Sequence, residues 1–249
     1  MPYEPHPHLA TPPDDTVLWR YIDFARFAQL LENRQLWFSR ADQFEDPLEG
    51  TLTDGEIRFE PNTAGATPQY RDATSDPLAQ MMRRSTYVNC WRMGSSESLA
   101  MWDLYCKGSG SVAITTTVGR LKDQISIDRR QVFMAQIRYV EWNVPNTLNG
   151  MLDLVTRKNI SYAHEAEMRA FLWDVAFVPK PEPGSIREHP VGQTIAIDPQ
   201  ELISELWIGP SEKSSIQPLV EGLVARYGLH FTIRASDKMS SRRQVQFRA

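Results

Sequence analysis

The sequence has few of the features that mark disulfide-rich, zinc-binding or membrane-spanning proteins. Its 249 residues include two cysteines, Cys90 and Cys106, which have neither the number nor the spacing of a disulfide framework or a zinc site. It contains no run of ~18 consecutive apolar residues, the length that a membrane-spanning helix requires. It also does not begin with the basic and then apolar stretch of a signal peptide. We therefore expect a cytoplasmic protein without a membrane-spanning segment.

A strong charge of one sign is also missing. The chain has 27 Lys and Arg against 31 Asp and Glu, a formal net charge of −4, which excludes a protein whose whole surface attracts nucleic acid. One local exception is the C-terminal segment, where a single acid, Asp237, accompanies Arg234, Lys238, Arg242, Arg243 and Arg248. We expect a solvated tail or edge strand there and no nucleic acid partner for the rest of the chain, so that this segment is the one place where nucleic acid could bind.

Aromatic residues are abundant, with 7 Trp, 8 Tyr and 10 Phe in a chain that is otherwise ordinary for a globular protein. Buried aromatic side chains stabilise a core or line a ligand cleft. Residues 1–16 differ from the rest because they hold five of the 17 prolines. We predict a disordered, proline-rich leader over residues 1–16 and one domain over residues 17–249.

The remaining sequence predicts a mixture of strands and helices. Residues 17–22 alternate and favour a strand, and Asp23 is placed to cap an amphipathic helix over residues 24–33. Further strands are predicted at residues 36–39, 86–92, 111–117, 131–140, 206–209 and 229–233, and further helices at 78–84, from Ser95 or Ser96 to 107, at 148–159, after the capping Asp198, and at 216–227. Residues 61–76 are expected to form a surface excursion. Without regular βαβ alternation, the predicted fold class is α+β, with a mixed or antiparallel sheet flanked by helices in a single domain.

Charged and apolar residues alternate from Glu165 onward, which favours a strand over a helix. On a strand, Glu165, Glu167 and Arg169 share one face, because side chains alternate between the two faces. Three charged side chains are therefore expected to line one surface.

Several short motifs occur in an order that resembles one bacterial family. They lie at residues 19–21, 36–39, 44–50, 90–92, 100–105 and 165–169. Their series is similar to that of the family catalogued as domain of unknown function 2971. Departures are Glu45 where the family has Asn, Trp91-Arg92 in place of Phe-Ser, and a shorter segment at residues 106–110. The resemblance implies a compact α+β domain, encoded in bacteria and sometimes near mobile or defence elements, without an established reaction.

A second resemblance concerns chemistry. Arg20, Thr115 to Thr117 and Glu165-Ala166-Glu167 follow the order of the arginine, the Ser/Thr triplet and the Glu-x-Glu of arginine-class ADP-ribosyltransferases. The resemblance implies NAD as a substrate. It also implies that Glu167 stabilises the oxocarbenium-like transition state and that Glu165 orients the acceptor.

The same resemblance suggests which side chains contact NAD. An arginine holds the diphosphate, hydroxyl groups support the site, and aromatic rings stack on nicotinamide. The candidate cofactor-binding residues are Arg20, Tyr21, Trp37, Ser39, Trp102, Tyr105 and Thr116. For Trp102 and Tyr105, a place in the core is the favoured interpretation, because Trp102 shares one side of its helix with Leu99, Asp103 and Cys106.

Other interpretations of these charged residues stay open. Glu165, Glu167 and Arg169 are also compatible with a solvated ion-pair ladder. The acids Asp42, Glu45, Asp46 and Glu49 could serve Mg²⁺ or Ca²⁺, but their spacing fits no EF-hand. A turn with Glu45 or Glu49 paired to Arg40 or Arg169 is simpler, and we expect no metal.

Two alternatives concern function. Cys90 could be a nucleophile if the fold brought His164 beside it, although a buried cysteine is more often part of a core. The chain could also be a non-catalytic accessory module that binds an unknown protein or small-molecule partner, for example in a defence or mobile-element system.

Overall fold

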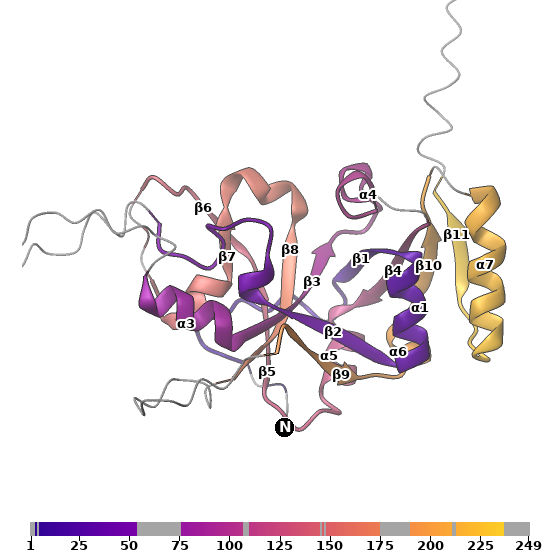
Figure 1. Ribbon diagram of the computed structural model, residues 1–249, viewed down its shortest axis with the longest axis horizontal. Coiled ribbons are helices and arrows are strands. Elements are labelled where there is room, and N and C mark those ends of the chain that lie inside the picture. The colour runs from indigo at the N-terminus through magenta and orange to yellow at the C-terminus, as the bar shows by residue number, and fades with distance from the viewer. Residues whose placement is uncertain are drawn as a thin grey trace, which may run out of the picture. The chain divides into compact units, whose positions relative to one another are not determined.

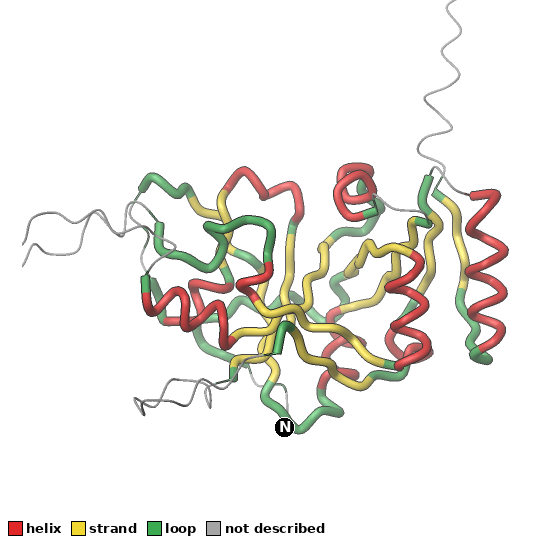
Figure 2. Tube along the Cα trace, viewed as in Figure 1, coloured by secondary structure: helices red, strands yellow, loops and turns green. Residues whose placement is uncertain are grey.

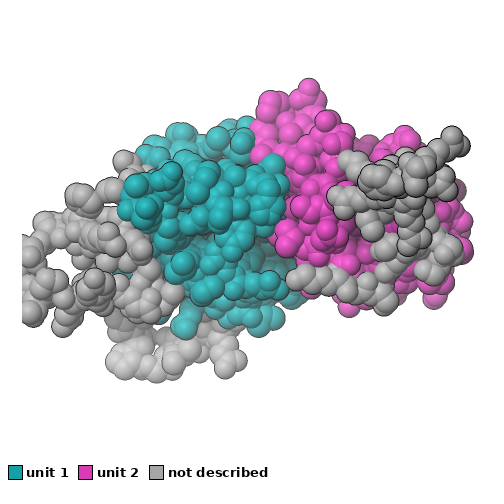
Figure 3. All heavy atoms as spheres, turned by 90° about the horizontal axis from the view of Figure 1, so that it is seen from above, with its two compact units in different colours: residues 1–11, 37–90, 129–194 teal, residues 12–36, 91–128, 195–249 magenta. Residues whose placement is uncertain are grey.

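The computed structural model describes residues 3, 5–53, 76–106, 110–144, 146, 148–174, 190–210 and 213–236. The chain divides into two compact units, coloured in Figure 3. Unit 1 comprises residues 1–11, 37–90 and 129–194, and unit 2 comprises residues 12–36, 91–128 and 195–249. The strands β2 (Gln35–Arg40), β3 (Thr86–Met93) and β9 (Gly192–Ala196) each begin in one unit and end in the other.

The sheet of unit 2 is mostly antiparallel. Its strands are β1 (Val17–Asp23), β4 (Ser111–Thr117), β10 (Glu205–Ile208) and β11 (Thr232–Ala235). β4 pairs antiparallel with both β1 and β10, whereas β11 runs parallel to β10. Leu18, Ile114 and Leu206 are fully buried on one face of this sheet, and Trp19, Tyr21 and Ala113 are buried on the other, so both faces carry core residues.

Helices flank this sheet (Figure 2). They are α1 (Phe24–Asn33), α4 (Leu99–Tyr105), α5 (Val118–Ile125), α6 (Pro199–Leu202) and α7 (Lys213–Arg226). Asp23 caps α1, because its carboxylate accepts a hydrogen bond of 2.7 Å from the Arg26 N–H, and α1 buries Phe27 and Leu31. Gly228 follows α7 with φ of +64°, a conformation that favours glycine.

In unit 1, β8 (Glu167–Trp173) lies at the centre of the sheet. It pairs antiparallel with β5 (Val132–Gln136) and also pairs with β3. Figure 1 labels all three strands. β3 pairs in turn with β2 through Ser39 and Val88. The other elements are α3 (Pro77–Ser85), the parallel strands β6 (Arg138–Val140) and β7 (Arg157–Asn159), and the 3-10 helices η1 (Ala41–Gln43), η3 (Met151–Val155) and η4 (Ile160–Glu165).

The core of unit 1 is built around the stacked rings of Phe133 and Phe171, whose centroids are 5.4 Å apart. Val88, Leu154 and Met82 belong to the same buried cluster. The proline-rich N-terminal segment contributes as well, since Leu9 packs on this cluster and the Thr11 hydroxyl donates to the Met134 carbonyl at 2.9 Å.

The predicted α+β class with a mixed, mostly antiparallel sheet is confirmed. The helix predicted over residues 148–159 is wrong, because this stretch forms η3 and then β7. α5 and β9 had no sequence prediction. The capping residue of α4 is Ser98, not Ser95 or Ser96. The predicted excursion at residues 61–76 and the basic segment after residue 236 lie almost wholly outside the described residues.

Candidate functional site: a buried charge network in unit 1

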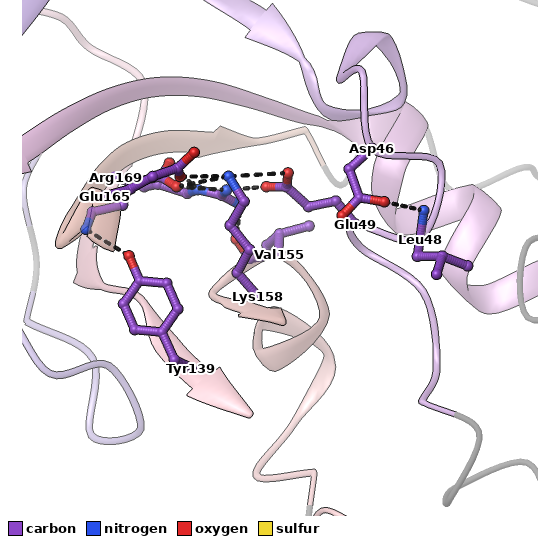
Figure 4. A network of polar contacts seen from close by, with 9 residues as sticks. Asp46, Leu48, Glu49, Tyr139, Val155, Lys158, Glu165 and Arg169 are labelled. Carbon is purple, nitrogen blue, oxygen red and sulfur yellow. Dashed lines mark hydrogen bonds and ion pairs between the residues drawn. The ribbon is translucent and has the colours of Figure 1, made fainter. Parts of the chain in front are cut away.

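A group of charged side chains is buried in unit 1 where β8 begins (Figure 4). It consists of Glu49, Lys158, Glu165, Glu167 and Arg169, each with at most 7% of its surface exposed. η4 ends at Glu165 and β8 starts at Glu167, while Ala166 between them takes the left-handed conformation with φ of +43°. The alternative interpretation, a solvated ion-pair ladder, is therefore wrong, because these charges are in the interior.

Arg169 is the most completely bonded member. Its Nε and Nη2 donate to the two carboxylate oxygens of Glu167 at 2.7 and 3.2 Å, and its Nη1 donates to the Val155 carbonyl at 2.8 Å. Nη2 also donates to Glu49 Oε1. A guanidinium suits this fork of contacts because its donors lie in one plane.

Lys158 lies among three carboxylates. Its Nζ is 2.6 Å from Glu165, 3.5 Å from Glu167 and 3.6 Å from Glu49. The ring of Tyr162 lies 4.6 Å from the same nitrogen. Burial by itself lowers the pKa of Lys158, but the three nearby carboxylates outweigh burial and raise it above its ordinary value. The ammonium group is therefore charged at every physiological pH.

Glu49 reaches the network from a turn, residues 44–50, that follows η1. The turn is closed locally, because the Leu48 N–H donates to the Asp46 carboxylate at 2.9 Å. The turn also supplies Phe44, whose ring centroid is 5.2 Å from Cζ of Arg169. Figure 4 shows Glu49 extending from the turn toward Arg169 and Lys158. The simpler sequence interpretation, a turn with Glu49 paired to Arg169, is confirmed.

Glu167 is held in its ionised form. Burial raises the pKa of its carboxyl group, but the charge and hydrogen bonds of Arg169, together with Lys158, lower the pKa to about 2. The Glu167 N–H donates to the Tyr139 hydroxyl at 2.8 Å, and burial raises the pKa of Tyr139 to about 12. The network thus presents a fixed, permanently charged carboxylate beside a neutral phenol.

Cys90 borders this network but lacks the properties of a nucleophile. Burial, and next the charge of Glu167, raise the pKa of its thiol well above the ordinary value. The thiol is therefore protonated at neutral pH, whereas nucleophilic attack needs a thiolate. The imidazole of His164 is exposed and contacts the Ser161 carbonyl at 3.2 Å.

Two of the predicted NAD contacts, Trp37 and Ser39, are in unit 1. The indole of Trp37 is 47% exposed and donates to the Ser39 hydroxyl at 3.0 Å. Gly192 lies flat against this ring, since a Cβ there would be 2.1 Å from Trp37 Cζ2. Ser39 pairs with Val88, and Val88 packs in one cluster with Phe171. By strand alternation, Trp37 and Ser39 therefore share a sheet face with Glu167 and Arg169.

The other predicted contacts are in unit 2, where they divide between the two faces of the sheet. Tyr21 and Trp102 are buried against each other edge to face, with centroids 4.9 Å apart. The Ser98 N–H donates to the Tyr21 hydroxyl, and burial raises the pKa of Tyr21 to about 12. Tyr105, on the same helix as Trp102, is 45% exposed.

Arg20 and Thr116 lie on the opposite face from Tyr21, because Thr116 pairs with Leu18 on β1. Arg20 has its Cζ 5.7 Å from the centre of the Trp91 ring, and the Thr116 hydroxyl donates to the Leu202 carbonyl at 2.6 Å. The structure thus brings together Glu165 with Glu167, Trp37 with Ser39, and Tyr21 with Trp102.

Sequence reasoning missed Lys158 and Tyr139. Lys158 fell in the wrongly predicted helix, where a lysine is expected in solvent, and Tyr139 sits in a strand where nothing marks its contact with Glu167. One signal in the sequence could have indicated Lys158. Glu165, Glu167 and Arg169 are two acids and one base, so burying them together requires a second cation.

Two further findings on the described residues concern metal ions and membranes. Among them, no group of three or more His, Cys, Asp and Glu side chains is arranged to hold a metal ion. Every helix in these parts of the chain is too short or too polar to cross a membrane.

No protein-family model matches the sequence, and the comparison with curated proteins found no match. Solved structures that are similar to the chain include Thermus sp. 2.9 DarT in complex with NAD+ and in complex with carba-NAD+. Their TM-scores are 0.38 and 0.36, the identity is 10%, and each match covers 92% of this chain and 98% of that chain. With TM-scores below 0.5, the likeness assigns no residue a role, and membership of the domain of unknown function 2971 family stays a prediction.

Proposed function

We propose that the chain is an NAD-using transferase of the ADP-ribosyl type, in which Glu167 is the catalytic carboxylate. In this reaction the bond between ribose and nicotinamide breaks, nicotinamide leaves as a neutral molecule, and positive charge develops on the ribose. An acceptor then bonds to the same ribose carbon and loses a proton.

The observation that carries this proposal is the ionisation of Glu167. A carboxylate stabilises a developing positive charge best when it is charged and fixed before the reaction begins. Glu167 meets both conditions, because its pKa is lowered to about 2 and Arg169 holds both of its oxygens. Glu165, bonded to the same Lys158, would be the second acid of the pair and would orient the acceptor.

Trp37 supports the same proposal. An exposed indole offers a flat surface on which nicotinamide or adenine can stack. Trp37 and Ser39 lie on the sheet face that carries Glu167. In unit 2, Tyr21 and Trp102 bury their rings against each other, so we assign the stacking surface to Trp37.

A non-catalytic binding module is the second candidate function. The observation that favours it is the burial of the network: Glu167 is 5% exposed and Arg169 is 1% exposed. In such a module the charges would hold unit 1 together, and Trp37 would contact a protein or small-molecule partner.

Release of nicotinamide from labelled NAD separates the two functions. We expect the wild-type protein to release nicotinamide and Glu167→Gln to do so about 10²–10³-fold more slowly, the loss typical of one electrostatic group that stabilises a transition state.

Glu45→Gln is the matched control, because Glu45 is an exposed glutamate of the same unit, and it should keep the wild-type rate. If the folded wild-type protein neither binds nor cleaves NAD, or if Glu167→Gln cleaves it as fast as the wild type, the transferase proposal fails and the binding module remains.

A further inference from the structure

We propose that Arg169 and Lys158 form an oxyanion-binding site which the chain's own Glu49 occupies, and that the turn at residues 44–50 is its displaceable cover. The ligand would be a singly charged oxyanion, either a carboxylate or a phosphodiester-type phosphate. This site goes beyond the proposed reaction and holds whether or not the chain uses NAD.

The contacts of Glu49 are those of a bridging ligand. Its Oε1 accepts from Nη2 of Arg169, while its Oε2 is 3.6 Å from Nζ of Lys158. A carboxylate or a phosphate of a ligand has two oxygens that can take the same two places, one on each cation. Arg and Lys are the side chains that bind such anions most strongly.

The cover comes from one short turn. Phe44 lies over the guanidinium of Arg169 and Glu49 binds its end, and both side chains belong to residues 44–50. The turn is neither helix nor strand, and its Leu48 is 40% exposed. The remaining contacts of Arg169 with Glu167 and Val155 come from β8 and η3, so movement of the turn would leave them in place.

The balance of charge makes Glu49 the replaceable acid. The network has three carboxylates and two cations, and each cation keeps a close partner without Glu49. Lys158 is 2.6 Å from Glu165, and Arg169 Nε is 2.7 Å from Glu167. Departure of Glu49 removes one negative charge from the site, takes away one hydrogen-bond acceptor of Arg169 Nη2, and removes a carboxylate that lies 3.6 Å from Lys158 Nζ, which is costly in a buried site. An incoming anion with one negative charge would restore the lost charge and the lost contacts with the two cations.

The test compares Glu49→Ala with wild type and with Glu45→Ala, a matched truncation of an exposed glutamate in the same turn. Acetate and dimethyl phosphate are the probes, titrated against the full chain at constant ionic strength with chloride as the reference salt. We expect at least about tenfold tighter binding of one probe to Glu49→Ala than to the other two proteins, which corresponds to about 1.4 kcal/mol. The probe that binds tells a carboxylate site from a phosphate site.

Equal binding of both probes to the folded Glu49→Ala and wild-type proteins would overturn the proposal. Hydrogen exchange of the wild-type protein tests displacement directly, and it decides alone if Glu49→Ala does not fold. With the probe in excess, deuterium uptake of residues 44–50 should rise while that of β8 does not. An unchanged uptake in the turn would overturn the displaceable cover. Neither probe contains nicotinamide or ribose, so these results are independent of NAD cleavage.

Discussion

The two units each contain an Arg–Glu pair beside an aromatic ring, and the two pairs differ mainly in their access to water. In unit 1, Arg169 Nε is 2.7 Å from Glu167, with Phe44 at 5.2 Å from the guanidinium carbon. In unit 2, Arg234 Nη2 is 2.8 Å from Glu205, with Trp207 at 5.8 Å. The arginine side chain is 1% exposed in the first pair and 52% exposed in the second.

The two Arg–Glu pairs have nearly equal N–O distances, but their contributions to stability differ. Water screens the exposed pair and solvates either partner when the other is removed, so the pair contributes little to stability. Removal of one partner from the buried pair leaves a charge with no solvent around it. The buried pair alone can fix the ionisation of a carboxylate, which is why the candidate site lies in unit 1.

Replacement of each arginine by methionine should show this difference most strongly. We expect Arg169→Met to lower the free energy of unfolding by about 3–5 kcal/mol, because it strands the carboxylates of Glu167 and Glu49 in the interior. Arg234→Met keeps a similar shape at an exposed site and should unfold at the wild-type urea concentration. Urea titrations of both variants measure the contrast. If both variants lost the same free energy of unfolding, the buried charge network would be accessible to water.

The pH dependence of stability sharpens the same comparison. Glu167 has a folded pKa of about 2 against an ordinary value of 4.5. Because the folded pKa is the lower one, the stabilisation is fully present above the ordinary value and is lost as the pH falls from 4.5 toward 2. This lowering of the pKa corresponds to a stabilisation on the order of 3 kcal/mol in the free energy of unfolding.

Glu167→Gln removes this titration, so its free energy of unfolding should fall less than that of the wild type between about pH 6 and pH 3. Glu205→Gln, which alters the exposed pair, should keep the wild-type slope. Urea titrations at several pH values provide the measurement. If the free energy of unfolding had the same pH dependence in all three proteins, Arg169 and Lys158 would not lower the pKa of Glu167.

Local signals in the sequence were sufficient for most of the elements. The helix over residues 24–33 was predicted with its observed bounds, because Asp23 is a strong cap and the apolar residues recur at helical spacing. Residues 148–159 misled the prediction, since their leucines and valine also fit a helix. There the Asp153 carboxylate accepts from the Asn149 N–H, just before the 3-10 helix begins, a local bond that periodicity does not reveal.

The candidate site was predicted only in part, and for a physical reason. Strand alternation correctly placed Glu167 and Arg169 on one face, because alternation is a local property. Burial of that face depends on Glu49 and Phe44, which are far away in the sequence, and on Lys158, which a separate strand supplies. The aromatic residues show the same limit: Tyr21 and Trp37 both lie on strands, yet one is in the core and the other is exposed.

Two glycines, one in each unit, extend the comparison to the smallest expected effect. Gly222 lies within α7, and a Cβ there would meet nothing within 4 Å. Gly222→Ala should therefore stabilise the protein by about 0.5–1 kcal/mol, because alanine loses less backbone freedom in a helix. At Gly192 a Cβ would be 2.1 Å from the Trp37 ring, so Gly192→Ala must push the indole away.

Because Trp37 is exposed, its ring can swing into solvent, and we expect Gly192→Ala to cost less stability than the overpacking of a core, which typically costs about 1–3 kcal/mol. The change should appear in fluorescence instead, as stronger quenching by acrylamide and a red-shifted emission, with Gly222→Ala keeping the wild-type spectrum. Trp37 is the most exposed of the tryptophans in the described part of the chain, so its movement should dominate the signal. An unchanged spectrum in Gly192→Ala would mean that the indole does not rest on this glycine, and the stacking surface assigned to Trp37 would lose its support.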